Sequence, residues 1–173
     1  MKDHILSIDK YGYALLKNIF SKTHCEKAKE ISSSYIKNQR IDFNNNISES
    51  SLSDKSQEKV LNNLQNKDYF YFDFFANKEI CSIVDHFLKR GSYANNEPFH
   101  IINSQVRALE PFAKKQQLHL DSNLPLQKEF PLVMVTIIML DDFTLDNGAT
   151  RVVPKSHLNN HYAENDKKYD NEV

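Results

Sequence analysis

The chain has 173 residues and a formal net charge of −1 at pH 7, a length that suits one domain with its own hydrophobic core. The balanced charge lacks the basic footprint of nucleic-acid-binding proteins. No run reaches the roughly 20 apolar residues of a membrane span, and the N-terminus lacks the apolar stretch of a secretory signal.

We therefore predict a single cytoplasmic domain over residues 1–173 whose partner is a small molecule, with no nucleic acid and no membrane. Cys25 and Cys81 are the only cysteines. Two cysteines are too few for a disulfide framework, so we expect two free, buried thiols.

The N-terminal half predicts helices. A short strand is expected over residues 11–16, followed by a helix to about Lys37 that Ser21 or Thr23 caps, with Glu26 completing a capping box. Residues 41–58 are rich in Asn and Ser and indicate a flexible surface loop. The aromatic residues 69–75 fit core packing better than a substrate pocket.

A second helix is expected after Asn77, ending at Gly91. Beyond it the pattern changes to short apolar segments separated by turn signals. Strands are expected over residues 99–109, 116–121, 132–140 and 149–153, with a turn at 146–148. Helices first and strands later indicate an α+β fold with a β-sandwich or barrel core.

The most informative segment for function is QLHLD, residues 117–121. On a strand, residues two apart point to the same face, so His119 and Asp121 would project together while Leu118 and Leu120 face the core. An imidazole and a carboxylate are two of the three ligands in the 2-His-1-carboxylate iron site. A histidine and an aspartate at this spacing are common by chance, so the pair alone is weak evidence.

The case for a metal site becomes stronger when QLHLD is read with three other motifs. The order and spacing of the four motifs resemble those of the phytanoyl-CoA dioxygenase family. They span most of the chain and depart from the family pattern at Lys155, where glycine is usual. The motifs are DKYGY (9–13), QLHLD (117–121), LDDF (140–143) and DNGATRVVPKSH (146–157).

The resemblance implies a double-stranded β-helix, a cupin-like jelly roll, with the N-terminal helices packed on it. It also implies an oxidoreductase that uses Fe(II), 2-oxoglutarate and O₂ to hydroxylate a small organic substrate. His119 and Asp121 would be the metal ligands, and Gln117 would donate a hydrogen bond to 2-oxoglutarate. Because Asp121 occupies the position that related halogenating enzymes leave open for chloride, hydroxylation is favoured over halogenation.

The third ligand of the family comes from a strand farther along, which also supplies an Arg or Lys for 2-oxoglutarate. Residues 160–173 form a polar tail without such a strand, so the last core strands are expected to be missing. Arg151 and His157 are not assigned to the site. Three interpretations stay open: a fragment of a longer dioxygenase, a natural truncation in which His157 or His161 is the third ligand, and a non-catalytic jelly-roll binding module. A metal-binding cupin with other chemistry, such as an isomerase, is a further class.

Overall fold

The structure is a computed structural model, and it describes residues 1–38, 58–89, 99–109, 111, 113, 116–122, 131, 133–159 and 161–163. The predicted loop over 41–58 lies outside the described residues except for its last position, and so does most of the polar tail. Within the described part, no helix is long and apolar enough to cross a membrane.

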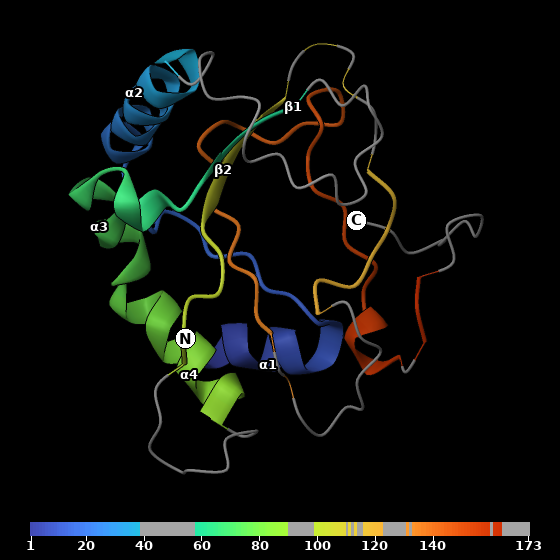
Figure 1. The fold of residues 1–173 in the computed structure, drawn as a ribbon. Coiled ribbons are helices and arrows are strands. Elements are labelled where there is room, and N and C mark those ends of the chain that lie inside the picture. The colour runs from blue at the N-terminus through green and yellow to red at the C-terminus, as the bar shows by residue number, and fades with distance from the viewer. Residues whose placement is uncertain are drawn as a thin grey trace.

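Four α-helices and two strands make up the regular structure of the described residues, with short 3₁₀ turns between them (Figure 1). The helices are α1 (Lys2–Tyr11), α2 (Lys22–Asn38), α3 (Phe72–Phe75) and α4 (Lys78–Leu88); the strands are β1 (Glu58–Asn62) and β2 (Gln105–Leu109); the 3₁₀ turns are η2 (Leu64–Asn66), η3 (Tyr69–Tyr71) and η5 (Ser156–Leu158).

The two strands form one antiparallel pair in which Leu61 lies opposite Val106. The ladder ends at Ser104, whose carbonyl accepts a hydrogen bond from the Asn63 amide at 2.9 Å. The Ser104 hydroxyl accepts another from the Leu64 amide at 3.0 Å. These bonds turn the chain out of β1 into η2, so the strand predicted over 99–109 is regular only over its last five residues.

A core cluster joins α2 to the sheet and to the aromatic segment that follows it. Its buried members are Ala28, Leu61, Leu64, Tyr71 and Phe74. The prediction of core packing is therefore confirmed for four residues of the aromatic run, since Phe70 and Phe75 pack against the cluster that contains the buried Tyr71 and Phe74. Tyr69 and Phe72 of that run are exposed.

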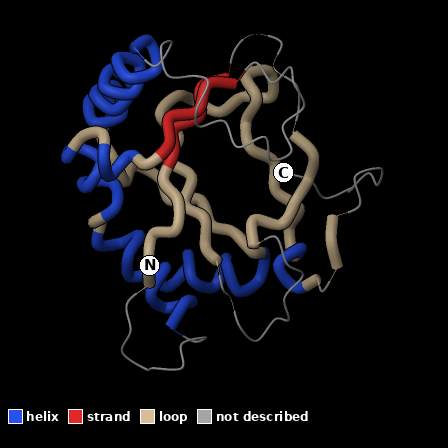
Figure 2. The backbone as a smooth tube through the Cα atoms, in the orientation of Figure 1, coloured by secondary structure: helices blue, strands red, loops and turns tan. Residues whose placement is uncertain are grey.

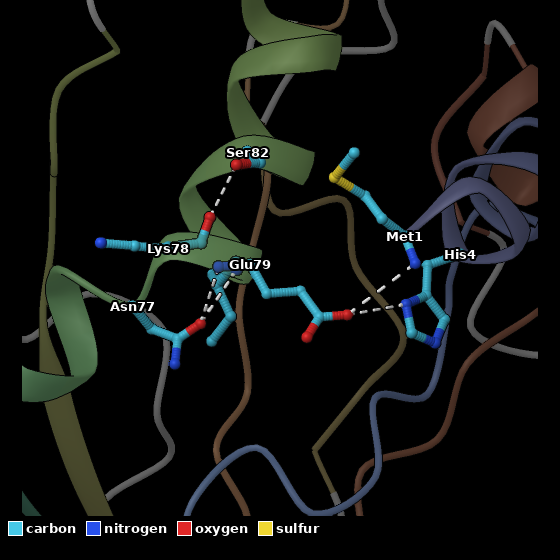
Figure 3. Close-up of polar contacts among 7 residues, drawn as sticks. Met1, His4, Asn77, Lys78, Glu79 and Ser82 are labelled. Carbon is cyan, nitrogen blue, oxygen red and sulfur yellow. Dashed lines mark hydrogen bonds and ion pairs between the residues drawn. The ribbon is translucent and has the colours of Figure 1, made fainter.

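Both predicted helices are confirmed, with changes at their ends. The N-cap of α2 is Ser21, whose hydroxyl accepts a hydrogen bond from the His24 amide at 3.2 Å; the helix begins at Lys22, so the Thr23 capping box is wrong. Asn77 caps α4 as predicted, accepting from the amides of Glu79 and Ile80 at 3.1 Å each (Figure 3). Cys25 and Cys81 are free, but half-buried rather than buried.

The strand predicted over residues 11–16 is wrong. Of these residues only Tyr11 is helical, as the last residue of α1, and residues 13–16 carry no assigned strand. Gly12 takes the left-handed conformation (φ 87°) that ends a helix. The pair Tyr11-Gly12 is thus a helix stop, which the sequence reading took for the start of a strand.

The double-stranded β-helix is not confirmed. Of the strands predicted after Pro98, only β2 is regular, and the described parts of 116–121, 132–140 and 149–153 carry no assigned strand (Figure 2). A strand is defined by its ladder hydrogen bonds, and side-chain alternation alone does not supply a partner.

The segment 133–140 nevertheless shows the side-chain alternation of an extended chain. Ile138 and Leu140 pack on the core cluster. Val133, Val135, Ile137 and Met139 are between 37% and 52% exposed. Ile138 and Leu140 are thus partly covered while the alternate row is open, as in a half-buried extended segment, but Thr136 in the same row as Ile138 is exposed.

Candidate metal centre

The predicted ligands His119 and Asp121 lie next to each other on the exposed segment 116–122. His119 Nε2 is 3.4 Å from Asp121 Oδ1, and both side chains are about 60% exposed. The segment is not part of a ladder, yet residues two apart point the same way. The predicted juxtaposition of an imidazole and a carboxylate is therefore present without the predicted strand.

A backbone contact sets the orientation of the His119 ring. Its Nδ1 atom lies 2.9 Å from the carbonyl oxygen of Gln117. Because a carbonyl oxygen can only accept, Nδ1 carries a proton, and in the neutral imidazole the lone pair is then on Nε2. A metal-binding histidine usually has its second nitrogen fixed in this way.

The two donor atoms have a spacing that suits one metal ion. Two ligand atoms at about 2.1 Å from an octahedral ion, and at a right angle to each other, are about 3 Å apart. The observed 3.4 Å between Nε2 and Oδ1 is slightly longer. The pair fits two positions of a facial iron site, and no group of three His, Cys, Asp or Glu side chains that could hold a metal occurs among the described residues.

Gln117 has a role that the sequence did not reveal. Its backbone carbonyl holds the His119 ring, whereas the prediction concerned its side chain, which is exposed. Only the local backbone path brings that oxygen to Nδ1, so residue type gave no signal for it.

The LDDF motif at residues 140–143 is linked to helix α2 by a side-chain contact. Lys29 on α2 donates to Asp141 Oδ1 at 2.8 Å and pairs with Glu26 at 2.9 Å. The hydrogen bond from Lys29 to Asp141, followed by that to Glu26, raises the pKa of Lys29 well above its ordinary value. Lys29 thus stays a cation that ties residue 141 to the helix.

The predicted turn at residues 146–148 is confirmed and is built on Asn147. Its side-chain amide donates to the Asp142 carbonyl at 2.5 Å, and its Oδ1 accepts from the Thr144 amide at 2.9 Å. Gly148 has a φ of 78° and lies against the Leu109 side chain. The loop between the LDDF motif and residue 149 is therefore closed by one side chain.

The open assignment of His157 or His161 as third ligand receives no support from the geometry. His157 Nε2 lies 3.3 Å from the Asp9 carbonyl, and His161 Nδ1 lies 3.0 Å from the Tyr162 carbonyl. Neither joins the His119–Asp121 pair in a group of three. Arg151, which was not assigned to the site, is half-buried.

One comparison with known proteins bears on these motifs. A family model described as phytanoyl-CoA dioxygenase matches residues 8–172. No solved structure matches the chain. The match covers the two candidate ligands, the LDDF motif and the turn at 146–148.

Proposed function

Because the chain belongs to the phytanoyl-CoA dioxygenase family, we propose that it is an Fe(II)- and 2-oxoglutarate-dependent oxygenase that hydroxylates a small organic substrate. The family implies an oxygenase of this kind on a cupin-like jelly roll. The observation that carries the proposal is the pairing of His119 Nε2 with Asp121 Oδ1 at 3.4 Å. Two donors that iron prefers thus meet at one point of the family motif.

His119 and Asp121 would hold the iron. His119 would bind through Nε2, because its Nδ1 proton is directed to the Gln117 carbonyl. Asp121 offers an anionic oxygen that offsets part of the metal charge. When bound, Fe(II) supplies the activation of O₂ and couples oxidative decarboxylation of 2-oxoglutarate to oxidation of the substrate.

The side chain of Gln117 is our proposed contact for 2-oxoglutarate. It is two residues from His119 and four from Asp121, a spacing that puts side chains on one side of an extended backbone. Its amide N–H groups suit the carboxylate oxygens of 2-oxoglutarate. Replacing it with Glu at nearly the same size should weaken 2-oxoglutarate binding more than iron binding, because a second carboxylate repels the cosubstrate.

An anaerobic titration with Fe(II) and 2-oxoglutarate tests the metal centre. We expect the weak visible charge-transfer band of the iron chelate in the wild type and its loss in His119→Ala and Asp121→Ala. His86→Ala, a histidine on α4, is the matched control and should keep the band. A second readout is succinate release, which should stop in the same two variants.

Two results of these assays would refute the proposed iron site, and a third would refute the proposed use of 2-oxoglutarate. One is a folded wild type that gives no band and releases no succinate, which would indicate a non-catalytic jelly-roll binding module. The other is a band that survives His119→Ala, which would place the iron elsewhere. Turnover that does not depend on 2-oxoglutarate would instead indicate a cupin with different chemistry.

A further inference from the structure

Helix α1 lies across one end of the molecule with little core of its own. In Figure 1 it runs between α4 at one end and η5 at the other. None of its residues is buried, and Ile5 and Ile8 are only half-buried. Helices of ten residues are marginal in water by themselves, because nucleation is costly. Contacts at the two ends of α1 therefore add to the limited packing of its half-buried face in holding the helix in place.

The C-terminal end of α1 is held by the turn around Pro154. The amide of Lys155 donates to the Tyr11 carbonyl at 2.8 Å, and the His157 ring reaches the Asp9 carbonyl at 3.3 Å. A carbonyl can only accept, so His157 Nε2 carries the proton in this contact. Both acceptors belong to the last turn of the helix, whose carbonyls have no partner within the helix. Residues far along the chain thus cap α1.

Gly12 makes this contact possible. An added Cβ at Gly12 would lie 2.5 Å from His157 Nδ1 and 2.9 Å from its Cγ. The His157 ring therefore packs against the glycine backbone, in a space that any side chain would fill. The positive φ of Gly12 ends the helix at the same point. One glycine both stops α1 and seats the histidine.

The N-terminal end of α1 is held by α4. His4 Nδ1 lies 3.4 Å from Glu79 Oε1, and the Met1 amino group lies 4.0 Å from the same oxygen (Figure 3). His4 Nδ1 is inaccessible to solvent and makes no hydrogen bond. Glu79 is in the first turn of α4, two residues after the cap Asn77. At this helix junction the Met1 amino group and the Glu79 carboxylate form a long, partly exposed ion pair, and the His4 ring lies beside the same oxygen.

We propose that α1 is a strap, fastened by His157 at its C-terminal end and by His4 at its N-terminal end, which opens as a unit while the core cluster stays folded. The strap joins α4 to the turn at residues 154–157, which is the end of the motif over residues 146–157. His157 acts as a latch on α1, so its Nε2 is committed to the Asp9 carbonyl. The core cluster of α2, β1, η2, η3 and α3 includes no residue of α1, so it need not unfold when the strap opens.

Native-state hydrogen exchange on the full chain tests the strap directly. The amides of residues 5–12 should exchange faster than those of α4 and of the β1–β2 ladder, through local opening. His157→Ala should speed exchange of residues 5–12 by about five- to tenfold, the effect of one lost hydrogen bond with its packing. His4→Ala should speed it by about two- to threefold. His161→Ala is the matched control and should change nothing in α1.

A double-mutant cycle tests the latch separately. Gly12→Ala is strained by its positive φ and also clashes with His157. In the His157→Ala background only the strain remains, so Gly12→Ala should cost less stability there. Gly148→Ala is the control, because Gly148 also has a positive φ (78°) but lies against Leu109. Its cost should be the same in both backgrounds.

These measurements distinguish local opening of α1 from unfolding of the whole domain. Selective acceleration of residues 5–12, with coupling only between positions 12 and 157, supports the strap. If α1 and α4 exchange at the same rate in the wild type and respond equally to His157→Ala, α1 belongs to the global folding unit and the proposal is wrong. Equal costs of Gly12→Ala in both backgrounds would overturn the latch.

Discussion

The buried hydroxyl groups of Ser32 and Tyr71 predict how the stabilities of three variants should rank, because the direction of their hydrogen bond follows from the atoms around them. Ser32 is 3% exposed and Tyr71 is 2% exposed, and their oxygens are 2.8 Å apart. Ser32 Oγ is also 2.6 Å from the Ala28 carbonyl. That carbonyl can only accept, so it takes the single Ser32 proton. Tyr71 must therefore donate to Ser32.

The direction of the bond makes the two single variants unequal. Ser32→Ala leaves the Tyr71 O–H buried without an acceptor, which costs about 1–3 kcal/mol. Tyr71→Phe removes the donor but leaves the Ser32 bond to Ala28 in place, at a cost of about 0.5–1.5 kcal/mol. The double variant contains no unsatisfied hydroxyl. It should be more stable than Ser32→Ala alone, although it carries one more substitution.

Urea unfolding of the four proteins measures this order, with Ser34→Ala as the control on the same helix. Ser34 donates to the Ile31 carbonyl at 2.7 Å but is exposed, so its loss should have little effect. A Ser32→Ala cost of about 2 kcal/mol should lower the Tm by roughly 4–8 °C in a chain of this size. If the double variant is less stable than Ser32→Ala, the deduced donor is wrong.

The same residue predicts the alkaline limit of stability. Burial raises the pKa of the Tyr71 hydroxyl above its ordinary value. In the unfolded chain a tyrosine ionises at about pH 10, so unfolding releases a proton above that pH. The contribution of Tyr71 is complete below about pH 10 and is lost as the pH rises toward the folded pKa. Between about pH 9 and pH 11, Tyr71→Phe should therefore lose less stability than the wild type.

Three further predictions follow from single contacts. Asn77→Ala should cost about 1 kcal/mol in urea unfolding, because two amides of α4 lose their cap, while Asn77→Asp should keep most of it; equal losses would contradict the cap. Lys29→Met should destabilise the chain at low salt and much less in 1 M salt, where the Debye length is about 3 Å instead of about 10 Å at 0.1 M. A loss independent of salt would indicate packing instead. His157→Ala should keep the iron chelate band, and loss of the band from a folded variant would make His157 a ligand.

The sequence predicts correctly those structural features that depend on residues close together in the chain. The helical spacing of apolar residues and the cap at Asn77 predicted α2 and α4, because these signals act within one turn. The spacing of His119 and Asp121 placed their side chains on the same side, because alternation is a property of the extended backbone. The motif series identified the family, which the match over residues 8–172 confirms.

The remaining features depend on residues that only the folded chain brings together. Asp9 and His157 are 148 positions apart, and Lys29 and Asp141 are 112 apart. No local pattern predicts such pairs, so the sequence alone indicates neither β1 nor the contacts that hold α1, and residues 11–16 have the pattern of a strand although a helix ends at Gly12. The sequence by itself determined helices α2 and α4, the juxtaposition of His119 and Asp121, and the family. Tertiary structure alone decided how α1 is fastened and that His157 caps a helix, because ring packing and the acceptance of a proton by a carbonyl require two surfaces in contact.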